Sequence, residues 1–200
     1  TSTAMAGYFK DQVKAELNAW KSESGKDVDL YRDGLKVYTT LDGRMQKYAE
    51  KAVREHLSQL QVTFDREMKK GKDPFKENPT ILTTEMKRSW RWKSSEEAGM
   101  SDAEIKESFN HPLKMNVFTW DRGMVDTLLS PLDSIKHSIR HLQTGFMSMD
   151  PHTGEVKAWV GGIGYESFKY DHVRQSKRQV GSTFKPFVYT ALFESGLAGP

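Results

Sequence analysis

A proline near the C-terminal end fixes where the last helix of this chain begins. Pro186 lies in the stretch "GSTFKPFVY". A proline is tolerated only in or near the first turn of a helix, because deeper inside it removes a hydrogen bond and clashes with the preceding turn. The helix therefore begins at about Gly181 or Ser182, and Gly196 is suited to end it. Apolar residues at i, i+3, i+4 and i+7 predict a wide buried face, made of Phe184, Phe187, Val188 and Ala191.

The same first turn carries a serine and a lysine three residues apart. Residues at this spacing share a helix face, so the hydroxyl of Ser182 and the amine of Lys185 can meet. A serine becomes a strong nucleophile when a base removes its proton, and burial or a helix N-terminus can lower the pKa of a lysine enough to serve as that base. Free backbone N–H groups beside Ser182 are suited to stabilise an oxyanion. The spacing therefore predicts acyl transfer, with a solvated serine and lysine as the alternative.

Composition excludes several classes of site. The 200 residues include 30 Lys and Arg against 27 Asp and Glu, and a net charge of +3 predicts no nucleic-acid partner. There is no cysteine, which rules out disulfides, thiolate zinc sites and thiol catalysis. We predict neither a metal nor a cofactor. No run of 18 apolar residues occurs, so membrane attachment is expected only through a segment outside this chain.

Residues 1–62 predict a small α/β linker module. Apolar residues at helical spacing predict a helix over 7–20, and the alternation in "LKVYTTL" predicts a strand over 35–41. Asp42 is suited to cap the helix that follows. The expected buried face of that helix consists of Met45, Ala49, Ala52, Val53, His56, Leu57 and Leu60.

Residues 63–130 predict an irregular insert or subdomain. The stretch "KKGKDPFKENPT" is rich in turn-forming and basic residues. Ser101 and Glu104 have the spacing of a capping box at the start of a helix. The segment "MNVFTW", residues 115–120, is typical of a short strand.

Regular patterns return over residues 131–200. Ser130, Pro131 and Asp133 agree with one another as the start of a helix. The stretch "GFMSMDPHTGEVKAWVGG", residues 145–162, predicts a β-hairpin with its turn at the Asp, Pro and Gly. A polar loop then leads to the final helix.

Several of these stretches together resemble one family, the class A penicillin-binding proteins. "GLKVYTTLDGRMQKYAEKAV" resembles the family's linker strand and helix, and "GFMSMDPHTGEVKAWVGG" resembles the first hairpin of its transpeptidase domain. "RQVGSTFKPFVY" resembles its active-site helix, and "YFKDQVKAEL" is similar to the stretch that follows its glycosyltransferase domain. The segments occur in the family's order over most of the chain, which is far more specific than S-x-x-K alone.

The resemblance implies a fold and an activity. The expected fold is α+β, the N-terminal part of a transpeptidase domain like that of penicillin-binding proteins and serine β-lactamases, with a mainly antiparallel sheet flanked by helices. The implied activity is D,D-transpeptidation of peptidoglycan stem peptides. Ser182 would be the nucleophile, Lys185 the proton acceptor and the Ser182 backbone N–H one arm of the oxyanion hole. β-Lactams would acylate the same serine. The implied location is the periplasmic face of the inner membrane, in a parent protein that is also a glycosyltransferase.

The sequence departs from the family pattern after the lysine. The family also has an S-x-N motif and a K-[ST]-G strand well downstream of its serine, and neither occurs in the fifteen residues that follow Lys185. We therefore expect the chain to be a fragment with an incomplete sheet. By itself it should show no measurable transpeptidation and little labelling by penicillin.

Two other functions remain open at this point. A serine β-lactamase shares the S-x-x-K motif, but the linker-like "TTLD" has no place in it. A non-catalytic scaffold that binds other cell-envelope proteins belongs to a different class. Labelling of a longer protein by penicillin distinguishes enzyme from scaffold, and slow release of the drug distinguishes transpeptidase from β-lactamase.

Smaller constellations favour structural interpretations. His137 and His141 are spaced to share a metal, but their angular position predicts the solvated side of a helix. Trp90 and Trp92 alternate with basic residues, a pattern suited to stacking on nucleic-acid bases or to contact with an anionic membrane surface. A strand with alternating faces is the simpler interpretation. The cationic residues of the loop before the final helix are suited to steer an anionic substrate, or are simply solvated: Arg174, Lys177 and Arg178.

Overall fold

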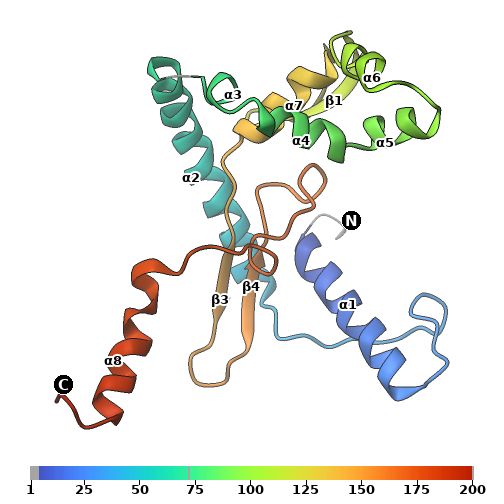
Figure 1. Ribbon diagram of the computed structural model, residues 1–200. Coiled ribbons are helices and arrows are strands. Elements are labelled where there is room, and N and C mark those ends of the chain that lie inside the picture. The colour runs from blue at the N-terminus through green and yellow to red at the C-terminus, as the bar shows by residue number, and fades with distance from the viewer. Residues whose placement is uncertain (1–4, 72, 200) are drawn as a thin grey trace.

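The computed structural model describes residues 5–71 and 73–199, and its α+β architecture confirms the expected fold class (Figure 1). In chain order the helices are α1 (Gly7–Ser24), α2 (Gly43–Lys70), α3 (Pro74–Glu77), α4 (Thr80–Arg88), α5 (Trp90–Glu97), α6 (Asp102–Ser108), α7 (Pro131–Arg140) and α8 (Lys185–Glu194). A 3₁₀ helix, η1 (Gly181–Phe184), leads into α8. The strands are β1 (Leu113–Thr119), β2 (Gly123–Leu129), β3 (Phe146–Met149) and β4 (Val156–Val160).

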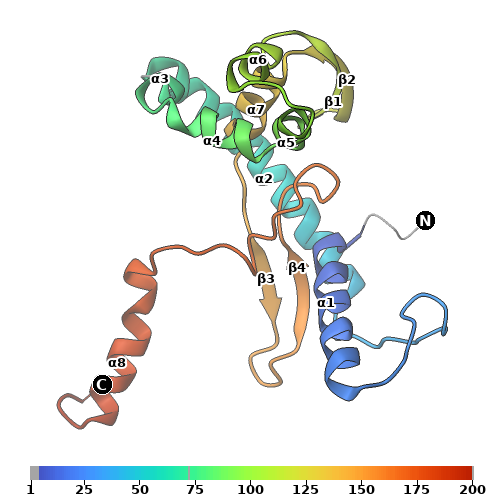
Figure 2. The ribbon, with the colours of Figure 1, turned by 45° about the vertical axis from the view of Figure 1, so that its right-hand side comes forward.

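The long helix α2 connects two hairpins that lie at its opposite ends. The antiparallel pair β3–β4 packs beside the first half of α2 and beside α1, whereas the antiparallel pair β1–β2 lies among the helices at the far end (Figure 1, Figure 2). Ala49 and Val53 of α2 pack against Ala158 and Val160 of β4. Helix α2 therefore sets the distance between the two halves of the chain.

The expected start of α2 is confirmed, but four of the seven residues expected on its buried face are exposed: Met45, Ala52, His56 and Leu60. The carboxylate of Asp42 accepts the backbone N–H groups of residues 44 and 45, at 2.8 and 3.2 Å. Met45 and Leu60 are 40% and 42% exposed, while Gln46 and Gln61 are 0% and 6% exposed. A hydrophobic pattern cannot find these two glutamines, because they are buried by hydrogen bonds to distant backbone groups.

The strand expected over residues 35–41 is not present. The segment touches β4 through the Thr40 hydroxyl, which donates to the carbonyl of Val156 at 2.8 Å. One backbone bond follows, from the N–H of Asp42 to the carbonyl of Lys157 at 3.0 Å. A strand ladder needs a series of backbone hydrogen bonds, but here the chain enters α2 after this single one.

The far end of α2 carries a helical unit with its own core. Met86, Trp92, Ile105 and Phe109 are buried together, and α7 packs against them through apolar side chains. The capping box at Ser101 is confirmed, and so is the strand predicted from "MNVFTW", which lies in β1. Leu132 and Ile135 of α7 therefore belong to the packing of this unit, while the division of the chain at 63 and 131 stays a prediction.

The strand expected for the tryptophan segment is wrong, because these residues form α5. Ser89 caps the helix, accepting the Trp92 backbone N–H at 3.2 Å. Trp92 is 2% exposed and Trp90 is 82% exposed. Residues two apart on a helix point about 200° away from each other. The buried–exposed alternation thus fits helix and strand alike, and the serine cap was the signal that distinguished them.

Two local predictions in the C-terminal third are confirmed. The Ser130 hydroxyl accepts the backbone N–H of Asp133 at 3.1 Å, and Pro131 lies in the first turn of α7. Asp150 closes the β3–β4 turn by accepting two backbone N–H groups, and Gly154 adopts a φ of +74° that favours glycine.

The final helix begins where Pro186 requires but does not bury its apolar face. Pro186 lies in the first turn of α8, and Gly196 follows the helix with a φ of +71°, as expected. Phe187 is nevertheless 68% exposed and Val188 is 51% exposed. Figures 1 and 2 show α8 standing away from the other elements. The predicted buried face is therefore wrong for this structure, because no described element lies against it.

No helix within the described ranges combines the length and the apolar character that crossing a bilayer requires.

Candidate functional site

The serine and lysine of the S-x-x-K motif lie in one continuous turn. Ser182 is in η1, Lys185 is the first residue of α8, and the backbone N–H of Lys185 bonds to the carbonyl of Ser182. Ser182 is in the first turn, so its own N–H has no acceptor within the helix. Both residues are on the same short segment, as the spacing predicted, and the free N–H is available to a ligand.

The surroundings of this turn are open to solvent. Every residue from 177 to 191 is exposed. Five cavities of about 310 to 710 Å³ are lined by described residues, and none of them includes Ser182 or Lys185. Ser182 and Lys185 therefore lie on an exposed turn, outside these five cavities.

The loop before the motif is anchored to α1 and β4. The Trp159 ring N–H donates to a carboxylate oxygen of Asp171 at 2.9 Å, and the Tyr8 hydroxyl donates to the carbonyl of Phe168 at 2.5 Å. Burial raises the pKa of Tyr8 to about 12. Only glycine fits at Gly161, where an added Cβ would lie 2.5 Å from Asp171 and 2.6 Å from the Tyr8 ring.

These anchoring residues were missed by sequence reasoning. Their partners lie far along the chain, and no local spacing points to them. They hold the loop as far as about residue 175, after which the cationic side chains expected to be solvated, Lys177 and Arg178, are exposed. Arg174 is exposed as well, and its guanidinium donates to the side chain of Gln12.

The histidine pair does not face solvent, which corrects the expected position. His141 is 9% exposed, and its ring lies 4.5 Å from that of His137. The Nδ1–H of His141 donates to the carbonyl of His137 at 2.8 Å, and the Nε2–H of His137 donates to the carbonyl of Phe118 at 2.7 Å. His137 is half-buried, and His141 is buried because rings from outside α7 pack around it, a tertiary effect that the helical angle does not include.

The histidine pair contacts backbone carbonyls and aromatic rings. Each histidine uses one ring nitrogen in a hydrogen bond to a backbone carbonyl. The aromatic rings of Phe118, Trp120 and Phe168 surround His141, with ring centroids 5.3 to 6.3 Å from its own. In the described parts of the chain no three side chains of the metal-binding types gather in one place.

Burial of His141 makes the stability of the fold depend on pH. Desolvation lowers the pKa of His141 in the folded chain and outweighs the hydrogen bond to the His137 carbonyl, which raises it. The charge of His137 lowers the pKa and that of Asp65 raises it, both by smaller amounts. The unfolded chain, with a histidine pKa of about 6.5, then binds the proton more tightly. We expect the free energy of unfolding to fall as pH drops below about 6.5, in urea titrations at pH 7.5 and 5.5.

A pair of variants isolates this contribution. His141→Phe should flatten part of the pH dependence, whereas His56→Phe, on the exposed side of α2, should leave it unchanged. Burial also lowers the pKa of His172, so some dependence persists. Equal pH dependence in the wild-type protein and in His141→Phe would contradict the assignment.

Comparison with known proteins identifies the family. The model of the penicillin-binding protein middle domain matches residues 70–142, which include α7 and the β1–β2 hairpin. Penicillin-binding protein 1A of Rickettsia typhi is 31% identical over 223 aligned residues, covering 98% of this chain and 27% of the relative. Penicillin-binding protein 1A of Vibrio cholerae is 26% identical, covering 90% of this chain and 26% of that relative. Penicillin-binding protein 2D of Bacillus subtilis is 30% identical, covering 76% of this chain and 20% of that relative.

These matches place the chain among the penicillin-binding proteins. It belongs to the class A members of the family, as the resemblance implied, and it spans about a quarter of the length of the 1A relatives. No solved structure matches it significantly.

Proposed function

We propose that this chain contributes the nucleophile of a peptidoglycan D,D-transpeptidase. The observation that carries the proposal is the position of Ser182 and Lys185 in one turn at the start of a helix, within a chain that aligns over 98% of its length with a penicillin-binding protein 1A. The backbone places the serine where helix N–H groups are free.

The reaction follows the chemistry of an activated serine. The Ser182 oxygen attacks the penultimate D-Ala carbonyl of a stem peptide while Lys185 accepts its proton, and the Ser182 N–H stabilises the oxyanion. The bond to the terminal D-Ala then breaks, the proton passes to its amine, and D-Ala leaves. The amine of a neighbouring stem peptide attacks the acyl-enzyme, which releases the serine and forms the cross-link. No metal or cofactor takes part in these steps.

The rest of the proposal concerns the whole protein. β-Lactams acylate Ser182 in place of the stem peptide, the protein acts in cell-wall synthesis at the periplasmic face of the inner membrane, and it also carries a glycosyltransferase. Membrane attachment comes through a segment outside this chain. The names of the relatives and the order of the matching segments support this assignment.

Fluorescent penicillin tests the proposal directly. In a longer protein that contains this chain and extends to the length of the 1A relatives, we expect covalent labelling by penicillin. Mass spectrometry should map the drug to the peptide containing Ser182. The 200-residue chain should label weakly, because its serine lies on an exposed turn outside these five cavities. An adduct on another residue of the longer protein would overturn the assignment, and so would the absence of any adduct, which favours a scaffold.

The same adduct distinguishes transpeptidase from β-lactamase. A transpeptidase holds the drug because water reaches its acyl-enzyme slowly, so the fluorescent band should persist for hours after removal of free drug. Rapid release, with accumulation of hydrolysed penicillin, would instead favour a β-lactamase.

A further inference from the structure

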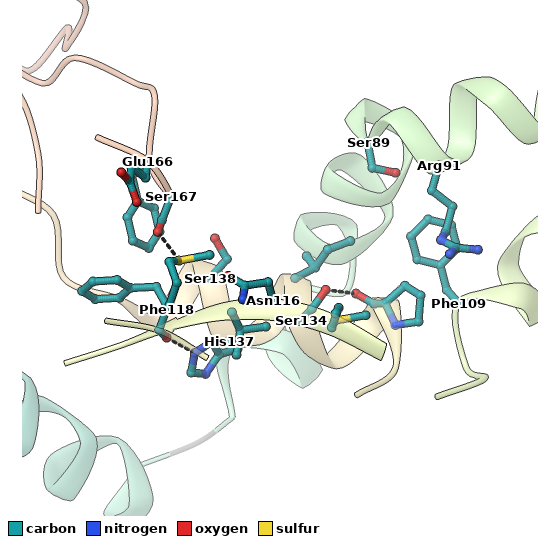
Figure 3. Close-up of a pocket in the computed structure, with 16 residues that line it drawn as sticks. Ser89, Arg91, Phe109, Asn116, Phe118, Ser134, His137, Ser138, Glu166 and Ser167 are labelled. Atoms are coloured by element: carbon teal, nitrogen blue, oxygen red, sulfur yellow. Dashed lines mark hydrogen bonds between the residues drawn. The ribbon is translucent and has the colours of Figure 1, made fainter. Parts of the chain in front are cut away.

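A groove runs between the helical unit and the loop that follows β4. Its volume is about 460 Å³, and its walls come from α5, α7, β1, Met124 of β2 and the loop at residues 166–168 (Figure 3). It is separate from the S-x-x-K turn. A cavity of this size with mixed polar and apolar walls falls in the range of ligand sites.

The groove follows the free edge of β1. Asn116 lies on the exposed face of the strand, Met115 and Val117 lie on its half-buried face, and all three line the groove. Residues from both faces of a strand can border one cavity only where it passes along the strand edge. β2 occupies the other edge, and no further strand pairs with β1 within the ranges that the structure describes.

The free edge is accessible over a short stretch. The carbonyl of Phe118 accepts the ring N–H of His137, so the groove is closed at that end of β1. The opposite wall is partly apolar, through Ile135 and Phe109, and the hydroxyls of Ser134 and Ser138 border it (Figure 3). An extended chain fits such an edge, because its backbone can pair with the strand while alternate side chains face the apolar wall.

The two ends of the groove carry opposite charges. Arg91 stands at one end and Glu166 at the other (Figure 3). Arg91 is half-buried, yet no described residue gives its guanidinium an ion pair or a hydrogen bond. Glu166 is exposed, and its carboxylate has no such partner among the described residues either. A partly buried, unpaired guanidinium is costly, and a carboxylate that binds it in two-point fashion offsets that cost.

We propose that this groove binds an extended segment of a partner protein, which adds to the edge of β1 with an acidic side chain at Arg91 and a basic side chain at Glu166. The free strand edge favours a peptide over a compact small molecule. The opposite charges at the two ends fix the direction in which the segment lies, because only one direction satisfies both of them. The partner is therefore recognised by a short alternating sequence with unlike charged ends.

Two synthetic peptides test the proposal. The first is acetylated and amidated Lys-Thr-Val-Thr-Val-Glu, and the second is Glu-Thr-Val-Thr-Val-Lys, so that one of them matches the strand direction. We expect fluorescence anisotropy with the intact protein to show a preference of at least about tenfold for one peptide. Amide hydrogen exchange should slow in the stretch 114–117 when that peptide is bound.

Matched variants locate the binding site. Arg91→Glu should weaken binding of the preferred peptide by at least about tenfold. Lys93→Glu, the same charge change on the exposed side of α5, should have little effect on binding. The double variant Arg91→Glu/Glu166→Lys should exchange the preference between the two peptides. A peptide N-methylated at alternate residues should not bind, because it cannot donate to the strand.

Three results would overturn the proposal. The first is the absence of binding of either peptide at millimolar concentration. The second is equal weakening by Arg91→Glu and Lys93→Glu, which would reduce the effect to overall charge. The third is undiminished binding of the N-methylated peptide, which would show that β1 is not the recognition edge. Circular dichroism confirms that each variant is folded.

Discussion

Ser182→Ala is expected to abolish acylation by penicillin in a longer protein that contains this chain and extends to the length of its penicillin-binding protein 1A relatives. The hydroxyl oxygen forms the covalent bond, so its removal leaves no nucleophile, and acylation should fall by at least about a thousandfold. The rate of appearance of the fluorescent band at several drug concentrations measures the effect. Lys185→Met should keep the serine but slow acylation by about 10²- to 10⁴-fold, the usual contribution of a general base.

Ser195→Ala is the matched control for this experiment. It makes the same substitution just after the C-terminal end of α8, where the hydroxyl donates only to the carbonyl of Leu192 at 2.7 Å. Acylation should remain at the wild-type rate. If Ser182→Ala keeps its labelling, another residue is the nucleophile and the proposed function is wrong for this site.

The second large effect is expected at Gln46, which joins α2 to β4. Its amide nitrogen donates to the carbonyl of Trp159 at 2.9 Å, and its amide oxygen accepts the Trp159 backbone N–H at 2.7 Å. The side chain therefore replaces a neighbouring strand along the edge of β4. The same nitrogen also donates to Glu50, whose carboxylate accepts the backbone N–H of Ala6.

We expect Gln46→Leu to lower the free energy of unfolding by about 2 to 4 kcal/mol, because it leaves two backbone groups of Trp159 without partners in a buried place. Gln59→Leu is the control, since this glutamine is exposed on the same helix. Urea unfolding with an unchanged slope measures the difference. A loss below about 0.5 kcal/mol would show that water satisfies Trp159 equally well.

Gln61 repeats the device at the other end of the helix. Its amide bonds to the carbonyl of Arg140 at 3.0 Å and accepts the N–H of Leu142 at 2.8 Å, while Asp65 takes the remaining donor. Each glutamine is followed four residues later by an acid, at Glu50 and Asp65. This repeated spacing was visible in the sequence, but the spacing alone does not reveal that the amides bind backbone groups of other elements.

The functional features also divide into those that the sequence predicted and those that only the folded structure shows. The motif, the proline and the glycine after the helix located the turn that carries Ser182 and Lys185. The groove along β1 had no counterpart in the sequence, because α5, α7 and the loop after β4 are brought together only by folding. Arg91 was part of a segment expected to be a strand, and its unpaired position became visible when that segment proved to be a helix.

The sequence by itself determined the local structure: the caps at Asp42, Ser101 and Ser130, the turn closed by Asp150, and the helix start set by Pro186. Each depends on bonds between residues at most a few positions apart, so neighbouring letters contain the whole interaction. Tertiary structure decided which surfaces are covered. Gln46 finds its partner 113 residues away, His141 is enclosed by three rings from two other segments, and the apolar face of α8 meets no described element. Burial depends on what the folded chain brings close, and no local pattern contains that information.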